Sequence, residues 1–196
     1  MAKAERSPSE VTVILDREGL AKVMGELAQA IVEALPDMDS VVLMGILSRG
    51  RPIADRLALR IQDLTGQAPR VGSLATTLYR DDLRSGRGIA KAGGGETHFD
   101  FSVDGLTVVL VDDVIHKART VRAAMDDLMD YGRPARVQLA ALVDRGGREL
   151  PIQPDYRGCV IGGFEEDHVR VLLDEIDDRD AVEVEHAAPK PRTMKE

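Results

Sequence analysis

The chain has 196 residues and a formal net charge of −8, with 43% hydrophobic and 3% aromatic residues. This length and hydrophobic content suit one domain with its own core and exclude a disordered chain. The negative charge argues against binding nucleic acid through bulk charge, and few aromatic side chains are available to stack on bases. Cys159 is the only cysteine, so neither an internal disulfide nor a cysteine metal cluster is expected. The sequence shows no long apolar run or secretory leader pattern, so we expect a cytoplasmic protein without a membrane partner.

Helical and strand patterns alternate along the chain, which is typical of an α/β domain. Asp16 is a good N-cap for the first helix, and Pro52 suits the first turn of the second. Continuous apolar runs predict strands that are buried on both faces, as in a parallel sheet. The predicted elements in chain order are helix 16–35, strand 41–46, helix 52–64, strand 71–79, strand 106–111, helix 120–131, strand 136–143 and a short β-pair of 160–161 with 168–173. We therefore expect an α/β fold with a mostly parallel central sheet flanked by helices.

The segment 80–104 is rich in glycine and charge and separates two of the predicted strands. A segment of this length inside a compact domain is either functional or disordered. The composition of the two ends predicts a mobile N-terminus at 1–10 and a mobile C-terminal tail at 183–196. A single domain over 11–182 remains.

The most informative stretch joins the strand at 106–111 to the helix at 120–131. Two adjacent carboxylates, Asp112 and Asp113, follow the strand directly, and a short loop leads into the helix. Ligands of parallel sheets bind just beyond the carboxyl ends of the strands, and a helix N-terminus presents free N–H groups that suit phosphate. The pattern indicates a site for a phosphorylated ligand, although an aspartate at a strand end is also common as a turn residue or helix cap.

A phosphorylation receiver domain also places paired acids at the end of a strand. That fold carries the acids on its first strand and needs most of a domain after them. At least two predicted strands precede Asp112 here, so the receiver alternative is disfavoured.

The stretch V-L-V-D-D-V-I-H-K-A-R-T at 109–120 resembles the phosphoribosyl-pyrophosphate (PRPP) motif of type I phosphoribosyltransferases. From about 13 to 182, the chain resembles the PyrR family of pyrimidine-operon attenuation regulators, which are also uracil phosphoribosyltransferases. Four further motifs stand in the order of that family: G-I-L-S-R-G at 45–50, T-L-Y-R-D-D-L at 77–83, G-R-P at 132–134 and V-D-R-G-G-R-E-L-P-I at 143–152. The resemblance implies the type I fold, with a small hood and a flexible loop, and the reaction of PRPP with uracil to give UMP and pyrophosphate.

The resemblance assigns roles around PRPP to residues that match the family motifs. Asp112 and Asp113 would bind the ribose hydroxyls, because ionised carboxylates accept strongly from such donors, and would stabilise positive charge at the anomeric carbon. In the family the loop after these acids holds the 5′-phosphate through N–H groups and a threonine hydroxyl. Here that loop consists of Lys117, Ala118, Arg119 and Thr120. The plain alternative for Thr120 is that it only caps the helix.

Two other loops would act on the pyrophosphate group. The segment that resembles the pyrophosphate-contacting loop is Ser48, Arg49 and Gly50. The flexible loop that closes over the site and excludes water would begin with Tyr79, Arg80, Asp81 and Asp82. Arg80 would neutralise pyrophosphate charge; its plain alternative is a surface pair with a neighbouring aspartate. Magnesium would arrive chelated by pyrophosphate, so no metal site built only of protein ligands is expected.

Two segments depart from the family pattern and predict weak activity. The phosphate loop usually reads Thr-Gly-Arg-Thr, and the replacement of its glycine by Ala118 removes easy access to a positive φ. The base-binding segment usually reads Gly-Lys-Asn-Ile-Pro-Thr-Ser, whereas here it is Gly-Cys-Val-Ile-Gly-Gly-Phe over 158–164. Uracil recognition needs polar groups, and the candidate base-binding residues are now Cys159, Val160 and Ile161.

The features that would bind RNA are reduced. The first predicted helix carries few basic residues, and the usual histidine of the D-R-G-H-R-E-L motif is Gly147, although Arg145 and Arg148 remain. Three hypotheses stay open: a uracil or related phosphoribosyltransferase, an RNA-binding attenuation regulator that senses nucleotides, and a family member that binds nucleotide without catalysis. We favour the first, with PRPP and a pyrimidine base or nucleotide as ligands. The resemblance also implies a homodimer or a higher homo-oligomer.

Overall fold

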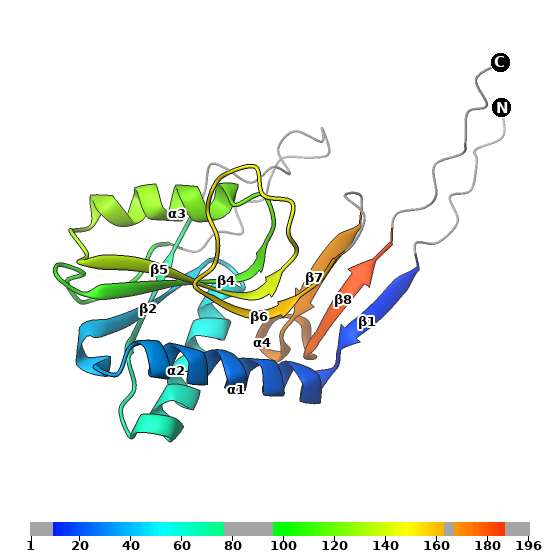
Figure 1. Ribbon diagram of the computed structural model, residues 1–196, viewed down its shortest axis with the longest axis horizontal. Helices are drawn as coiled ribbons and strands as arrows, with labels where there is room; N and C mark the ends of the chain where they lie inside the picture. The colour runs from blue at the N-terminus through cyan, green and yellow to red at the C-terminus, as the bar shows by residue number, and fades with distance from the viewer. Residues whose placement is uncertain (1–9, 77–95, 163–166, 187–196) are drawn as a thin grey trace, which may run out of the picture.

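The computed structural model describes residues 10–76, 96–162 and 167–186. They form a main sheet with helices on both faces and a smaller sheet at its side (Figure 1). The helices are α1 (Arg17–Ala34), α2 (Gly50–Thr65), α3 (Arg119–Asp130), the short α4 (Asp174–Asp177) and a 3-10 turn, η1 (Met38–Ser40). The strands are β1 (Val11–Leu15), β2 (Val41–Ile46), β3 (Arg70–Leu74), β4 (Thr107–Ile115), β5 (Arg136–Asp144), β6 (Tyr156–Val160), β7 (His168–Leu172) and β8 (Ala181–Glu185).

The main sheet has five strands in the order β3-β2-β4-β5-β6, and every neighbouring pair is parallel. Strand β4 is therefore central, with β2 and β5 on its two sides. Helices α1 and α2 cover one face and α3 covers the other (Figure 1). This arrangement confirms the expected α/β architecture.

Each face of the main sheet has its own core. Successive strand residues point to opposite faces, so Val109 and Val111 pack with α1 and α2, whereas Val108 and Leu110 pack with α3. All four are fully buried, which explains why the sequence shows a continuous apolar run rather than an alternating one.

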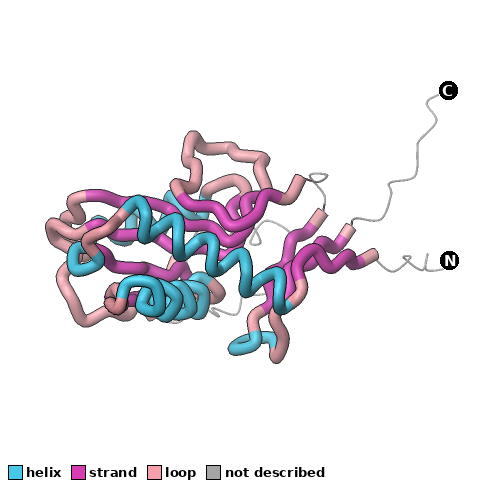
Figure 2. Tube along the Cα trace, turned by 60° about the horizontal axis from the view of Figure 1, so that its bottom comes forward, coloured by secondary structure: helices cyan, strands magenta, loops and turns pink. Residues whose placement is uncertain are grey.

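The smaller sheet is antiparallel, with β8 between β1 and β7. Figure 2 shows it standing beside the main sheet, next to the first turns of α1. The predicted pairing of 160–161 with 168–173 is wrong, because β6 joins the main sheet beside β5 and β7 pairs with β8. The prediction linked segments that are close in sequence, whereas Gly158 lets β6 lie against the β5 backbone; a Cβ there would stand 2.5 Å from the Leu142 carbonyl oxygen.

The predicted boundary of the C-terminal tail at 183 falls inside β8. Val182 and Val184 are buried, and β8 continues to Glu185. The acidic residues between the valines made this strand resemble a charged tail, yet Glu183 is also buried and pairs with Arg179 at 2.7 Å. Strand β1 was not predicted, because its side chains are mostly exposed.

Two predicted strands end at different places from those expected. The predicted strand at 71–79 begins at Arg70 and ends at Leu74, and residues 77–79 lie outside the described residues. The strand predicted to stop at 111 continues to Ile115, so Asp112 and Asp113 lie within β4 rather than after it. Asp112 remains in register with Ala141 of β5.

Candidate active site

The candidate site lies at the carboxyl end of β4, where the chain turns into α3. A cavity of about 100 Å³ opens there beside Asp112, whose side chain is only 6% exposed. Its lining comes from the end of β4, the turn and the first residues of α3: Asp112, Val114, Ile115, His116, Lys117, Ala118, Arg119, Thr120 and Val121. The structure thus brings together Asp112 and the whole predicted phosphate loop.

The two adjacent acids do not play equal geometric roles. Asp112 lines the cavity and Asp113 does not, as expected for consecutive residues of one strand. The Asp113 N–H donates to Asp112 Oδ1 at 3.0 Å, and the Val114 N–H donates to Asp113 Oδ1 at 2.9 Å. These bonds hold both carboxylates close to the backbone, with Asp112 as the acid of the cavity wall.

Ala118 adopts the backbone conformation that the family glycine would favour. Its φ of 67° and ψ of 13° are left-handed, and it is the N-cap residue of α3. A side chain in this conformation costs about 1–2 kcal/mol. The expectation that alanine prevents a positive φ is therefore wrong: the loop keeps the conformation and bears the strain.

The N-terminus of α3 is open toward the cavity. The helix begins at Arg119, and its N-cap makes no side-chain hydrogen bond. Thr120 is the second helical residue, so it is not the cap, and its hydroxyl makes no hydrogen bond within the described ranges. The first-turn N–H groups of a helix also have no helical partner. Amides and a hydroxyl thus border the same small cavity, which suits a phosphate group.

Glu149 links the two basic residues of the loop. Its Oε1 lies 2.9 Å from Lys117 Nζ, and its Oε2 accepts from Arg119 Nε at 2.8 Å and from Nη2 of the same guanidinium. The hydrogen bond from Lys117, followed by that from Arg119, lowers the pKa of the Glu149 carboxyl. Sequence reasoning missed this residue, although it belongs to the V-D-R-G-G-R-E-L-P-I motif.

Arg148 supports the loop from below. Its side chain is 10% exposed and donates to Asp144 Oδ1 at 2.8 Å. The same guanidinium donates to the carbonyl oxygens of His116 at 3.0 Å, Ile152 at 3.0 Å and Gly146 at 3.2 Å. Arg148 therefore supports the phosphate loop through these bonds, and its RNA contact stays a prediction.

Arg145 lies beside His116 in the turn between β4 and α3. Its Nη1 is 3.4 Å from His116 Nδ1. Gly147, with a φ of 68°, leaves room for the imidazole, because a Cβ at 147 would stand 2.7 Å from His116 Nε2. His116 therefore lies over the position where the family usually carries a histidine, and Arg145 beside it stays a predicted RNA contact.

The predicted pyrophosphate loop lies next to β4. A Cβ on Gly50 would stand 2.3 Å from the Val111 carbonyl oxygen, so only glycine allows this approach. Val111 directly precedes Asp112. The main chain of the predicted pyrophosphate loop therefore meets β4 one residue before Asp112. The Leu47–Ser48 peptide bond of this loop is cis.

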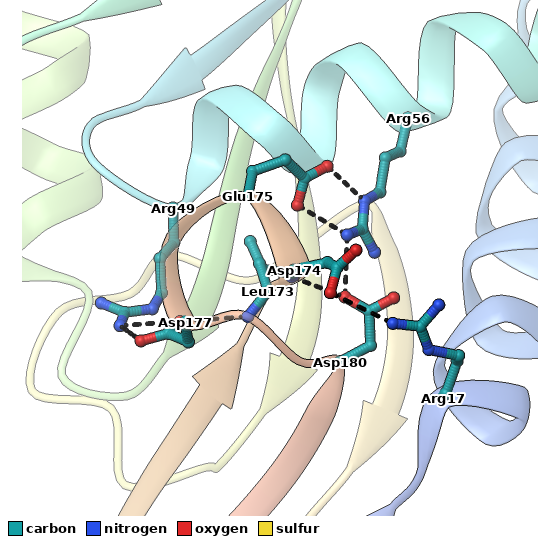
Figure 3. Close-up of polar contacts among 8 residues, drawn as sticks. All are labelled: Arg17, Arg49, Arg56, Leu173, Asp174, Glu175, Asp177 and Asp180. Carbon is teal, nitrogen blue, oxygen red and sulfur yellow. Dashed lines mark hydrogen bonds and ion pairs between the residues drawn. The ribbon is translucent and has the colours of Figure 1, made fainter.

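Arg49 already has a protein partner. Its Nη2 donates to Asp177 Oδ1 at 2.9 Å and Oδ2 at 3.2 Å, across 128 residues of sequence (Figure 3). Its Nε is buried, and no hydrogen-bond partner for it is found in the part of the chain that the structure describes. Sequence reasoning did not identify Asp177, because the contact joins distant parts of the chain.

The predicted base-binding residues diverge in space. Cys159 is half-buried at the end of β6, and burial raises the pKa of its thiol. Ile161 belongs to the core beneath, and its N–H donates to the Asp144 carbonyl oxygen at 2.9 Å. Val160 is 64% exposed. The three side chains therefore differ in exposure, and their role in base binding stays a prediction.

The first residues of the expected flexible loop, Tyr79, Arg80, Asp81 and Asp82, lie outside the described residues. Across 10–76, 96–162 and 167–186, no group of three His, Cys, Asp or Glu side chains could hold a metal ion. In those same ranges, no helix combines the length and apolar character needed to cross a membrane.

Solved phosphoribosyltransferases share this fold. The hypoxanthine phosphoribosyl transferase of Trypanosoma cruzi aligns over 94% of this chain and 95% of its own, with a TM-score of 0.65 and 18% identity. The HGPRT-ase of Leishmania tarentolae, solved in complex with GMP, aligns over 92% of this chain and 100% of its own, with a TM-score of 0.66 and 18% identity. At such identities the likeness shows the fold alone.

Sequence comparison identifies the family. Residues 10–176 match the phosphoribosyl transferase domain model. The bifunctional protein PyrR of Nostoc punctiforme is 47% identical over 176 residues, which are 90% of this chain and 97% of the relative. The PyrR of a Picosynechococcus species is 44% identical over 174 residues, which are 89% of this chain and 97% of the relative. The chain therefore belongs to the PyrR family within the type I phosphoribosyltransferases.

Proposed function

We propose that the protein is a uracil phosphoribosyltransferase of the PyrR type, which converts PRPP and uracil to UMP and pyrophosphate. The observation that supports this most directly is the turn at Ala118. Its left-handed conformation aims the first turn of α3 at the cavity that Asp112 also lines. An anion site beside a buried carboxylate suits a sugar phosphate, because one end is a phosphate and the other carries hydroxyl donors.

Each end of PRPP would meet a different part of the site. The amides of the first turn of α3 and the Thr120 hydroxyl would hold the 5′-phosphate. Asp112 would accept from a ribose hydroxyl and would stabilise the positive charge that develops at the anomeric carbon. Arg49 would balance charge on the pyrophosphate as the bond to it breaks and the base nitrogen bonds to the same carbon.

Magnesium would accompany PRPP. Its chemistry there is to neutralise pyrophosphate charge and to help this group to leave. The ion takes few protein ligands and keeps several waters, so the Asp112 carboxylate, together with oxygens of PRPP, would be a sufficient donor set.

The apolar composition of the candidate base-binding segment supports the proposal that catalytic activity is weak. A uracil-specific site needs polar groups for the edges of the base, and sites that pair such groups discriminate strongly. Neither Val160 nor Ile161 has a polar side chain, and the Ile161 N–H is already used. We propose that the remaining backbone groups bind the base with reduced specificity.

RNA binding is a weaker proposal for this chain. The PyrR relatives are described as bifunctional. The net charge of −8 and the burial of Arg148 leave little positive surface for RNA. A salt-sensitive shift with attenuator RNA would support this second function, and the homo-oligomer implied by the family is a prediction for sedimentation analysis.

The deciding experiment is calorimetric titration with PRPP and magnesium, followed by a turnover assay with radiolabelled uracil. The wild type is compared with the double variant Lys117→Thr/Ala118→Gly. We expect PRPP binding by both proteins and slow turnover by the wild type. Absence of wild-type binding, with binding by the double variant, would reject the proposed enzyme and assign the defect to the loop.

A further inference from the structure

The turn between β7 and β8 binds three arginines: Arg17 of α1, Arg56 of α2 and Arg49, the N-cap residue of α2. We call residues 173–180 the acidic turn. Its carboxylates contact the guanidinium groups as shown in Figure 3: Arg17 with Asp174 at 3.1 Å, Arg56 with Glu175 at 2.6 Å, Arg56 with Asp180 at 2.8 Å and Arg49 with Asp177 at 2.9 Å. Two of these arginines stabilise the turn, and the third, Arg49, belongs to the candidate pyrophosphate loop.

Arg56 fixes the acidic turn to α2. It makes two parallel bonds to Glu175, from Nε at 2.8 Å and from Nη2 at 2.6 Å, and Nη2 also bonds Asp180. The bidentate geometry is the strong form of an arginine–carboxylate pair. The hydrogen bond to Glu175 raises the pKa of Arg56, and the hydrogen bond from Arg56 lowers the pKa of Glu175. Arg56 therefore fixes the acidic turn independently of Arg49.

Asp177 is held on both sides. The Leu173 N–H donates to its Oδ2 at 3.0 Å, and Arg49 donates to both of its oxygens. The Asp177 side chain is 19% exposed, whereas that of Asp174 is 52% exposed. A carboxylate that the main chain has already fixed restricts the guanidinium that it binds.

Asp177 accepts hydrogen bonds from one of the three guanidinium nitrogens of Arg49, namely Nη2. Nε is buried without a partner in the described ranges, and no contact of Nη1 is found there. A buried donor without a partner is costly, so the bonds to Asp177 are needed to hold the guanidinium in this position. The backbone of the next residue, Gly50, meets the Val111 carbonyl oxygen, so the main chain that carries Arg49 lies against β4 one residue before Asp112.

We propose that Asp177 is a positioning residue for the pyrophosphate group of PRPP, an inference that rests on the proposed function. Asp177 acts through Arg49: it restrains the guanidinium by Nη2, so that Nη1 is oriented before the ligand arrives. Orientation in advance reduces the entropy that binding must remove. The smaller antiparallel sheet, through its acidic turn, therefore contributes to a site on the main sheet that it does not line.

The test compares Asp177→Asn with Asp174→Asn. The first keeps the shape of the side chain but removes its charge, and the second removes a charge from the same turn without touching Arg49. The Michaelis constant for PRPP, the inhibition constant of pyrophosphate and kcat are measured separately. We expect the two constants for Asp177→Asn to rise about tenfold, with kcat changed less than about twofold, because one charge-assisted bond is lost.

Further variants separate positioning from simple support of the fold. Asp177→Glu should recover part of the lost affinity. Asp177→Asn should add little in an Arg49→Gln background, because its effect passes through Arg49. Asp174→Asn should leave all three constants unchanged, and calorimetric melting should show both single variants folded.

Two outcomes would overturn the inference. Unchanged or tighter pyrophosphate binding by Asp177→Asn would mean that the carboxylate has no role or competes with the ligand, while the proposed function would stand. If the wild type bound neither PRPP nor pyrophosphate, the proposed function and this inference would both fail.

Discussion

The ammonium group of Lys117 lies 2.9 Å from the carboxylate of Glu149, although Lys117 stands where the family carries a threonine of the phosphate loop. Its charge is therefore balanced within the protein. Arg119 shares the same carboxylate. The extra positive charge of the loop is smaller than the sequence suggests, because Glu149 offsets it.

Removing the Glu149 charge should release that positive charge to the ligand. We expect Glu149→Gln to bind ribose 5-phosphate severalfold more tightly at low ionic strength, with the gain shrinking as salt screens it. Calorimetry at two salt concentrations measures the effect. Glu26→Gln, which removes the exposed partner of Lys22 on α1, is the control and should change nothing. Weaker binding by Glu149→Gln would show that the carboxylate is needed to shape the loop.

The left-handed Ala118 predicts a stabilising substitution. Ala118→Gly should raise the free energy of unfolding by about 1 kcal/mol, because relief of the strained φ exceeds the added flexibility of the unfolded chain. Urea denaturation measures the change. The matched control is Ala30→Gly at an exposed position of α1, where glycine should lower stability by about 1 kcal/mol. Losses of equal size in both variants would show that position 118 is not strained in solution.

Gly50 and Gly25 form a second matched pair. A Cβ on Gly50 would stand 2.3 Å from the Val111 carbonyl oxygen, whereas one on Gly25 would meet nothing within 4 Å. Gly50→Ala should therefore displace the pyrophosphate loop and cost about 2 kcal/mol or more of stability. Gly25→Ala in the interior of α1 should stabilise by about 0.5–1 kcal/mol. Thermal unfolding and PRPP affinity are measured for both variants. An affinity of Gly50→Ala for PRPP equal to that of the wild type would refute the close contact between Gly50 and Val111.

The acidic turn predicts a pH dependence of stability. The hydrogen bond from Arg56 lowers the pKa of Glu175; burial acts to raise that of Asp180, but bonds from Arg56 and the Asp174 N–H hold it below its usual value. Carboxyls with lowered pKa values in the folded state stabilise it above their unfolded values of 4.5 and 3.8. That stabilisation disappears as the pH falls through the lower folded values.

Urea unfolding between neutral pH and about pH 3 measures this dependence. The wild type should lose stability steeply below about pH 4. Arg56→Met removes the guanidinium that both carboxylates share, so its curve should be flatter in this range. Parallel curves for the two proteins would show that the turn does not contribute.

The sequence predicted β2 and β5 of the main sheet well, because their long buried apolar runs are visible in the sequence. Val41 to Ile46 are all buried, and their apolar run matched β2 at both ends. Strands β1 and β8 were harder to recognise in the sequence, because β1 is largely exposed and β8 alternates valine with glutamate. The extent of β4 was missed because aspartate is usually a turn residue.

The sequence predicted the site residues that are neighbours in the chain and missed those that come from distant segments. Asp112 and the residues from Lys117 to Thr120 are neighbours in sequence, and they line one cavity. Glu149 and Asp177 reach the site across 30 and 128 residues, so no local pattern identifies them. The backbone conformation of Ala118 also could not be predicted from an alanine, which rarely adopts it.

The pairing of β1 with β8 has a consequence for the order of folding. Val11 of β1 lies opposite Glu185 of β8. The hydrogen bonds of β1 to its partner strand can therefore form only after β8 has been synthesised. Strands β2 to β6 can assemble while the chain is still being synthesised, but β1 must remain unpaired until β8 has been made. Contacts of such long sequence separation form slowly. A chain that ends before residue 181 would therefore contain every strand of the main sheet and leave β1 without its partner strand.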